Sequence, residues 1–159
     1  MNAHDNLQGH SLSVNADRYL DVNAAGIPTT RPCDVEGTEF DFRSRKPIWT
    51  DRTIQSIDHN FCLCNKRREI TEVGTLFGEA ILMKIETTEP GLQVYTGLNL
   101  PTTNAKQEEL RPIKAHAGIA LEAQIWPDAP NHKDFPNAFL DVGEKYSHHT
   151  RYSFLRRLF

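Results

Sequence analysis

The sequence predicts an all-β protein, an antiparallel β-sandwich, and three observations carry that prediction. Short segments of alternating or β-branched character recur between clusters of turn residues. No window of about a dozen residues has a helical period. The strong candidate strands number about six to eight, which suits a small sandwich or a part of a larger one. The length of 159 residues is that of one ordinary domain.

The first expected strand covers residues 10–20, where Leu12, Val14 and Ala16 alternate with polar residues, as in a half-buried strand. The other strong candidate strands lie at 80–88, 92–98, 118–126 and 149–155. Turn-forming stretches bound them, such as the Glu-Pro-Gly that precedes the strand at 92–98. The polar stretch 102–110 has room for one helical turn, but the prediction is a loop insertion.

Charge and hydropathy argue against nucleic-acid and membrane roles. Eighteen Lys and Arg stand against twenty-one Asp and Glu, which leaves a net charge of −3 without a basic stripe. The longest apolar run, EAILMKI, is far shorter than the roughly 18 residues of a membrane span, and the polar N-terminus lacks a signal-peptide hydrophobic region. The expectation is a soluble cytoplasmic protein that binds neither nucleic acid nor membrane.

The three cysteines are interpreted as reduced thiols. Cys62 and Cys64 would lie on the same side of a strand, and Cys33 is distant in sequence. A zinc site would need two further ligands at suitable spacing. The sequence also has no glycine-rich phosphate loop, serine nucleophile elbow or paired Cys-x-x-Cys, so it indicates no cofactor and no metal.

Glu122 is a carboxylate within an otherwise apolar strand. Alternation places Leu121 on one face and Glu122 on the other, where it meets either solvent or a cleft. On the pattern alone, a solvent-facing glutamate is the simpler interpretation. In a cleft, such a carboxylate can take a proton from a sugar hydroxyl as a general base. The nearby Trp126, Pro127 and Pro130 suit a sugar site, because sugars present an apolar ring face as well as hydroxyls.

Asp58 is the second candidate site residue. It stands directly before His59 and Asn60 at the start of an apolar strand. An Asp-His pair in this position can be a turn that caps its own backbone, and the pattern alone favours that interpretation. The alternative is an acidic residue on a concave sheet face that contacts a sugar hydroxyl.

Several segments resemble, in order, the motifs of the aldose 1-epimerases, also called galactose mutarotases. The run LEAQIWPDAPNHKDFPNAFLDVGEKYSHHTRYSF resembles the closing segment of that family. IETTEPGLQVYTG is similar to its Thr-Thr-x-Pro-Gly-x-Gln-x-Tyr-Thr-Gly stretch, and IDHNFCL to its Asp-His-Asn-Phe segment. The run 10–48 is similar to further family motifs, such as Gly-Thr-x-Phe-Asp-Phe-Arg. The resemblance covers nearly the whole chain.

The resemblance implies a large antiparallel β-sandwich, a galactose mutarotase-like supersandwich, whose cleft binds an aldohexose. The implied reaction interconverts the α and β anomers of free sugars such as galactose or glucose, without cofactor or metal. A glutamate acts as general base on the anomeric hydroxyl, and a histidine acts as general acid on the ring oxygen. The base position matches Glu122, the sugar-binding aspartate matches Asp58, and a sugar-contacting glutamine matches Gln93.

The resemblance also predicts that residues 1–159 are the C-terminal portion of an aldose 1-epimerase-like domain. The family's acid histidine belongs to an upstream segment, and neither His4 nor His10 matches it. Half a sandwich would expose strand edges and apolar faces, which predicts self-association or a separately encoded N-terminal half as partner. The activity of this portion alone stays open, and the alternative function is a noncatalytic carbohydrate-binding remnant.

Overall fold

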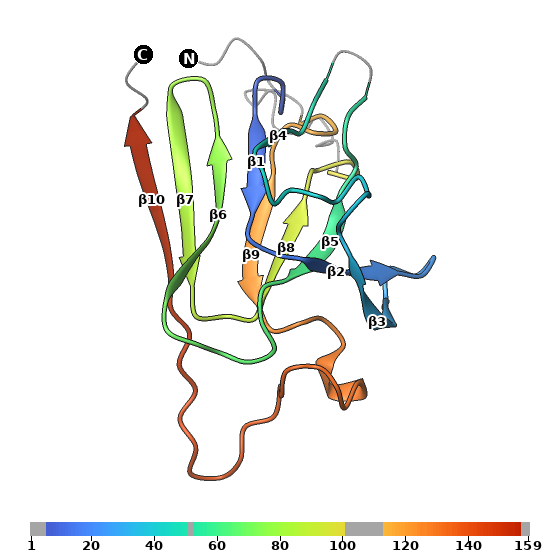
Figure 1. The fold of residues 1–159 in the computed structure, drawn as a ribbon, viewed down its shortest axis with the longest axis vertical. Helices are drawn as coiled ribbons and strands as arrows, with labels where there is room; N and C mark the ends of the chain where they lie inside the picture. Colours follow the sequence, from blue (N-terminus) through green and yellow to red (C-terminus); the bar gives the residue numbers. More distant parts are fainter. Residues whose placement is uncertain (1–5, 51–52, 101–112, 157–159) are drawn as a thin grey trace, which may run out of the picture.

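The chain folds into two antiparallel β-sheets that pack face to face (Figure 1). The computed structural model describes residues 6–50, 53–100 and 113–156. Its elements are β1 (Ser11–Val14), β2 (Arg18–Val22), β3 (Pro28–Asp34), β4 (Lys46–Pro47), β5 (Asp58–Cys62), β6 (Thr71–Phe77), β7 (Ile81–Thr87), β8 (Gly91–Tyr95), β9 (Ala120–Gln124), the 3₁₀ helix η1 (Ala129–Asn131) and β10 (Thr150–Arg156). Sheet I has the strand order β10-β7-β6-β1-β4, and sheet II has the order β3-β2-β5-β8-β9.

The all-β antiparallel prediction is confirmed. The described residues contain no α-helix, and η1 is a single short turn. No helix in those three ranges has the length and apolar character needed to cross a membrane. The expected strands at 80–88, 92–98, 118–126 and 149–155 correspond to β7, β8, β9 and β10. The expected loop at 102–110 lies outside the described residues.

The expectation of one strand over residues 10–20 is wrong, because the chain changes sheet there. β1 pairs with β6 in sheet I, whereas β2 pairs with β3 and β5 in sheet II. The inward side chains change from the even positions Leu12, Val14 and Ala16 to the odd position Tyr19, and all four lie in one core. Because both strands contribute to that core, the apolar alternation continues almost unbroken. The sequence pattern therefore does not show that the chain passes from sheet I to sheet II between the two strands.

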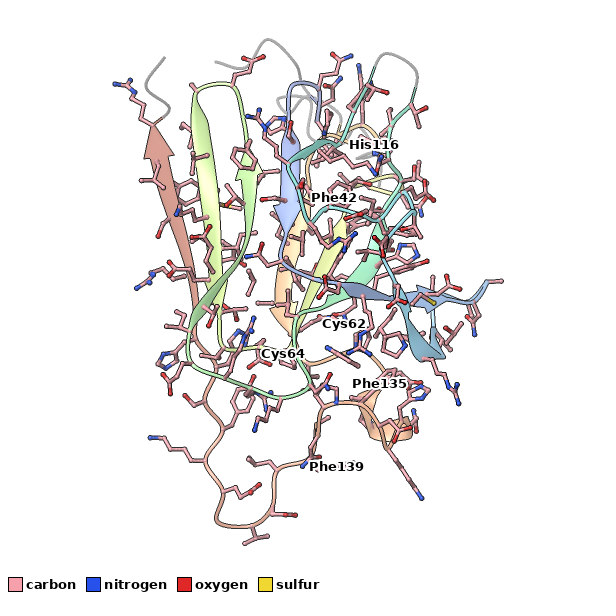
Figure 2. The ribbon with its side chains drawn as sticks, viewed as in Figure 1. Phe42, Cys62, Cys64, His116, Phe135 and Phe139 are labelled. Atoms are coloured by element: carbon pink, nitrogen blue, oxygen red, sulfur yellow. The ribbon has the colours of Figure 1, made fainter. Side chains whose placement is uncertain are left out.

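The main core fills the space between the sheets, and a second cluster covers part of the opposite face of sheet II (Figure 2). Leu20, Cys62, Trp126, Ala129 and Phe135 form this second cluster. Leu20 and Cys62 each follow a main-core residue directly along a strand, so their side chains point to the other face of the sheet. The segment after β9 therefore folds back over one end of sheet II.

The three cysteines are free, as predicted, but Cys62 and Cys64 do not share a face (Figure 2). β5 ends at Cys62, and the chain then turns so that Cys64 packs against the main core. Burial raises the pKa of the Cys62 thiol to about 12, so this thiol stays protonated and unreactive at neutral pH.

Candidate functional site

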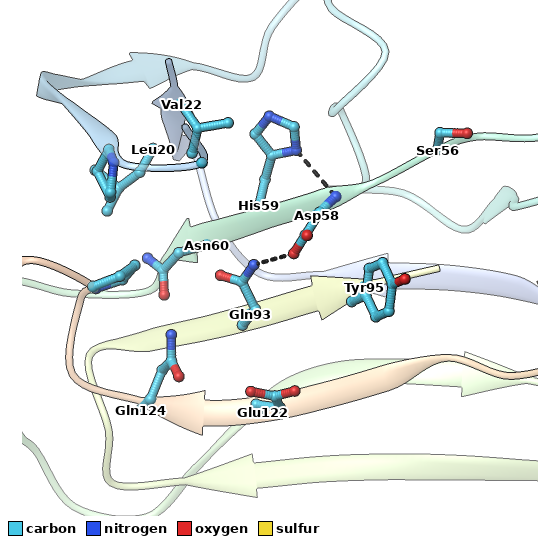
Figure 3. A pocket seen from close by; sticks show the side chains of 13 residues that line it. Leu20, Val22, Ser56, Asp58, His59, Asn60, Gln93, Tyr95, Glu122 and Gln124 are labelled. Atoms are coloured by element: carbon cyan, nitrogen blue, oxygen red, sulfur yellow. Dashed lines mark hydrogen bonds between the residues drawn. The ribbon is translucent and has the colours of Figure 1, made fainter. Parts of the chain in front are cut away.

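The register of β5, β8 and β9 brings the three predicted site residues onto one face of sheet II. Gln93 on β8 lies opposite Asn60 on β5 and, on its other side, opposite Glu122 on β9. Asp58 precedes Asn60 by two residues, so it points to the same face. Segments far apart in the sequence therefore place Asp58, Gln93 and Glu122 on three adjacent strands (Figure 3).

This face forms the wall of an open cavity of about 410 Å³. The volume is within the range of about 300–1,000 Å³ that small-molecule sites occupy. Asp58, Gln93 and Glu122 all line the cavity. The other lining residues are Leu20, Val22, Gly26, Pro28, Ser56, His59, Asn60, Tyr95, Gln124 and Pro127 (Figure 3). A few polar groups converge beside an apolar side, which is the composition expected of a site for a polar ligand with an apolar face.

A hydrogen bond fixes the orientation of the Gln93 amide. Its Nε2 donates to Oδ1 of Asp58 over 2.7 Å (Figure 3). Because a carboxylate only accepts, this contact identifies the amide nitrogen and leaves the amide oxygen of Gln93 as a possible acceptor for a ligand. The Glu122 side chain is exposed to the cavity and hydrogen-bonds to none of the described residues. Its carboxylate is therefore open to an incoming hydroxyl.

The interpretation of Asp58 as a turn that caps its own backbone is wrong. Asp58 is the first residue of β5, and its carboxylate accepts from Gln93. The neighbouring ring provides the local contact instead, because Nδ1 of His59 accepts from the backbone N–H of Asp58 over 3.2 Å. Gln93 and Asp58 thus form a polar pair across two strands, at the side of the cavity next to Glu122.

The His59 ring is held neutral by its surroundings. It packs 4.4 Å from the Phe40 ring and 5.8 Å from the Tyr19 ring, between centroids. Burial lowers the pKa of His59, although the charges of Asp21 and Asp58 partly oppose that effect. The hydrogen bond that Nδ1 accepts also requires this nitrogen to be unprotonated. His59 is the single histidine among the described residues that line the cavity.

Asn60 is a cavity-lining residue that the sequence does not predict. The residue is 1% exposed, and its amide makes no hydrogen bond of ordinary geometry with the described residues, although the neighbouring Cys62 thiol lies close enough to interact with it. Gly91 packs against this amide so closely that a Cβ there would lie 2.5 Å from Oδ1 of Asn60. A buried amide that lacks a well-formed hydrogen bond is unfavourable by about 1–3 kcal/mol, so such groups call for an explanation in a ligand, a water or a strained fold. The signal in the sequence is the two-residue spacing from Asp58.

The aromatic and proline residues after β9 divide between the cavity and the second cluster. Pro127 lines the cavity, as expected. Trp126 does not, because its indole Nε1–H donates to the Pro90 carbonyl over 2.8 Å and its ring lies edge-on to Phe135, 5.1 Å between centroids. Pro130 lies in η1 and does not line the cavity. The expectation that all three surround a sugar is therefore wrong for Trp126 and Pro130.

Two further histidines lie outside the cavity wall. His116 is buried, and its Nδ1 lies 2.7 Å from the Thr96 carbonyl oxygen. Nε2 of His132 lies 3.0 Å from a carboxylate oxygen of Asp128. The described part of the chain contains no group of three or more His, Cys, Asp and Glu side chains that could hold a metal ion.

Comparison with known proteins gives one consistent match. The sequence profile of the family described as aldose 1-epimerase matches residues 1–153. The chain is 38% identical over 154 residues to galactose mutarotase from Mus musculus, covering 94% of this chain and 44% of that protein. It is 36% identical over 160 residues to aldose 1-epimerase from Escherichia coli, covering 94% of this chain and 46% of that protein. The chain thus spans slightly less than half the length of these relatives.

Solved structures show the same fold. A crystal structure of an aldose epimerase homologue from C. elegans superposes with a TM-score of 0.82 at 24% sequence identity, covering 98% of this chain and 48% of that one. A galactose 1-epimerase from Lactobacillus acidophilus superposes with a TM-score of 0.67 at 25% identity, covering 95% of this chain and 45% of that one. The mutarotase-like β-sandwich expected from the sequence is therefore the observed fold.

Proposed function

Because the chain belongs to the aldose 1-epimerase family, we propose that its cavity binds a free aldohexose, such as galactose or glucose, and that it acts in the interconversion of the α and β anomers. Residues 1–159 then form the C-terminal portion of an aldose 1-epimerase-like domain. The observation that supports this proposal most strongly is the arrangement of these three residues: the strand register sets Glu122 directly opposite Gln93, and a side-chain hydrogen bond joins Gln93 to Asp58.

In this proposal Glu122 is the general base. Its carboxylate takes the proton from the anomeric hydroxyl while a general acid protonates the ring oxygen, so the C1–O5 bond breaks and an open-chain aldehyde forms. Rotation about the C1–C2 bond presents the other face of the aldehyde, and the reverse proton transfers close the ring as the second anomer. A positioned base of this kind contributes a rate factor of about 10²–10⁴.

Asp58 and Gln93 bind the sugar in this proposal. The Asp58 carboxylate accepts hydrogen bonds from sugar hydroxyls, and the Gln93 amide oxygen accepts a further one. Their mutual bond of 2.7 Å keeps both groups oriented before the sugar arrives. Pro127 and Leu20 provide the apolar side of the cavity against which a sugar ring can lie.

In this proposal the general acid comes from outside the described cavity wall. His59, the one histidine among the described lining residues, is a poor general acid, because burial lowers its pKa and leaves the ring neutral near pH 7. We propose that a partner supplies the acid, either a separately encoded N-terminal half or a second copy of the chain. The uncovered apolar residues at the end of sheet I, such as Ile81 and Phe154, support a partner of this kind.

A second candidate function is carbohydrate binding without turnover. The lack of a general acid favours this second function, since no histidine of the described cavity wall is arranged as an acid. The two functions agree on Asp58 and Gln93 and differ only in whether Glu122 transfers a proton.

Two-dimensional NMR exchange spectroscopy on galactose at anomeric equilibrium separates these functions in one sample. The enzyme hypothesis predicts cross peaks between the two anomeric protons that are stronger than in buffer with the chain, either alone or with a supplied N-terminal half of a relative, and that fall back to the buffer level with Glu122→Gln. Carbohydrate binding without turnover predicts broadened sugar signals without added exchange. The absence of both effects, with the chain alone and with a supplied N-terminal half of a relative, would contradict both functions.

A further inference from the structure

The strand that carries Glu122 lies at an edge of the fold. Among the described residues, β9 is the last strand of sheet II and pairs only with β8, so no described strand adjoins the backbone groups on its other side. An edge strand is held by half the ladder contacts of a central strand, so its position depends more on individual contacts from other elements.

Tyr152 provides such a contact from the other sheet. It lies on β10, opposite Ile85 on β7, and Ile85 is fully buried in the main core. The Tyr152 side chain therefore points toward sheet II. Its hydroxyl donates to the backbone oxygen of Leu121 over 2.9 Å. This hydrogen bond joins the edge strand of sheet I to the edge strand of sheet II.

The acceptor belongs to the peptide group that leads into Glu122. The Leu121 carbonyl and the Glu122 N–H are parts of the same planar unit, so a hydrogen bond to one fixes the orientation of both. The Leu121 side chain also packs against the main core. Burial, and then the charge of Glu122, raise the pKa of Tyr152, which keeps the phenol protonated as a donor and reflects its closeness to that carboxylate.

We propose that Tyr152 is a positioning residue for Glu122: its hydroxyl holds the Leu121–Glu122 peptide group of β9 in the orientation that aims the Glu122 carboxylate into the cavity. The functional part of this inference rests on the proposed function of Glu122 as base. The structural part, the link between β10 and β9, does not. A displacement of about 1 Å at a catalytic group can reduce a rate by up to about 100-fold, so one hydrogen bond at this place can affect turnover.

Tyr152→Phe tests the proposal, because it keeps the ring and removes only the hydroxyl. Tyr146→Phe is the matched control, since the hydrogen-bond partners of the Tyr146 hydroxyl, Nδ1 of His148 at 3.3 Å and Arg67, lie outside β9. In Tyr152→Phe we expect the amide hydrogens of β9 to exchange about fivefold to tenfold faster, the factor that follows from losing one net hydrogen bond. The Glu122 amide signal should shift as well. The control should leave both unchanged.

The second readout is the interconversion of galactose anomers. We expect Tyr152→Phe to lower kcat about threefold to tenfold with little change in KM, because Asp58 and Gln93 still bind the sugar. Unchanged exchange and an unchanged Glu122 signal would overturn the proposal. Faster exchange with an unchanged kcat would overturn the positioning role. Faster exchange in a chain that shows no turnover under any condition would confirm the link between the strands and contradict the proposed function instead.

Discussion

Asn60 lines the cavity, and its buried amide is also unfavourable for the stability of the fold. Both amide atoms lie beside the cavity and against Gly91 without a hydrogen bond of ordinary geometry to the described residues, and the nearby Cys62 thiol is a weak partner at best. Replacing the amide by an apolar group of similar size removes that unfavourable burial. We therefore expect Asn60→Leu to raise the free energy of unfolding by about 1 kcal/mol, measured by urea denaturation.

Asn60→Ala is the control, because it removes the same amide but leaves a space. It should be less stable than Asn60→Leu by about 2–5 kcal/mol. If Asn60→Leu is instead clearly less stable than the wild type, the amide has a partner such as an ordered water in solution. The view of Asn60 as an unsatisfied group would then be wrong.

His59 predicts a specific dependence of stability on pH. The pKa of His59 in the folded protein is lowered below the ordinary value of 6.5, mainly by burial. The folded protein therefore takes up this proton less readily than the unfolded chain does. The stability associated with neutral His59 is fully present above about pH 6.5 and is lost as the pH falls through the folded pKa.

His59→Phe keeps an aromatic ring between Phe40 and Tyr19 but cannot be protonated. Thermal unfolding at pH 7 and at pH 5 should show a smaller fall in Tm for this variant than for the wild type. Equal falls in both proteins would show that His59 does not contribute to the pH dependence.

Short motifs were enough to predict Asp58, Gln93 and Glu122 as a group, because each motif fixes one residue type at one place on a strand. The sequence does not predict the roles of Asn60 and Tyr152. The isolation of Asn60 depends on Gly91, on a different strand, packing against it. The bond from Tyr152 depends on how the edges of two different sheets approach each other. Neither relation follows from the alternation within one strand.

Among the elements, β6 passes so close to β1 that only glycine fits at position 74. A Cβ on Gly74 would lie 2.7 Å from the carbonyl oxygen of Ser13, which is backbone and cannot move without disturbing the pairing of the two strands. We expect Gly74→Ala to lower the free energy of unfolding by about 1–3 kcal/mol. Gly118→Ala is the matched control, because no atom lies within 4 Å of a Cβ there.

Chemical denaturation of the two variants checks this expectation. Gly118→Ala should remain within about 0.5 kcal/mol of the wild type. Equal stability of Gly74→Ala and Gly118→Ala would mean that β1 and β6 are less tightly paired than the structure has them.

The strands show where sequence patterns succeed and where they fail. The four expected strands that became β7 to β10 have continuous alternation within one sheet. The segment 10–20 also alternates, but its two halves belong to different sheets that share one core. Alternation reports which side chains are buried and does not report which sheet buries them. β6 was not among the expected strands, and Gly74 interrupts its pattern.

At the scale of the whole molecule, sheet I extends beyond the cover that sheet II provides. Ile81 and Phe154 lie on the side of their strands that faces inward, yet they are 53% and 68% exposed. They line an open groove of about 390 Å³ with Leu76 and Met83. Exposed apolar surface of this kind favours association, in keeping with the proposed partner.

We expect the chain alone to associate in a concentration-dependent way, measured by sedimentation velocity. Phe154→Glu should weaken the association. Val142→Glu introduces the same charge at a fully exposed loop residue away from this groove and should leave the association unchanged. A chain that stays monomeric at high concentration would show that this groove does not drive self-association.

Polarimetry on freshly dissolved α-galactose tests the central claim, that Glu122 is the base of anomer interconversion, most directly. The chain is measured alone and together with a separately supplied N-terminal half of a galactose mutarotase, and each preparation is repeated with Glu122→Gln. We predict that at least one wild-type preparation reaches anomeric equilibrium faster than buffer, and that Glu122→Gln lowers this acceleration by about 10²-fold or more. Acceleration that survives Glu122→Gln, or no acceleration in either wild-type preparation, would contradict the claim.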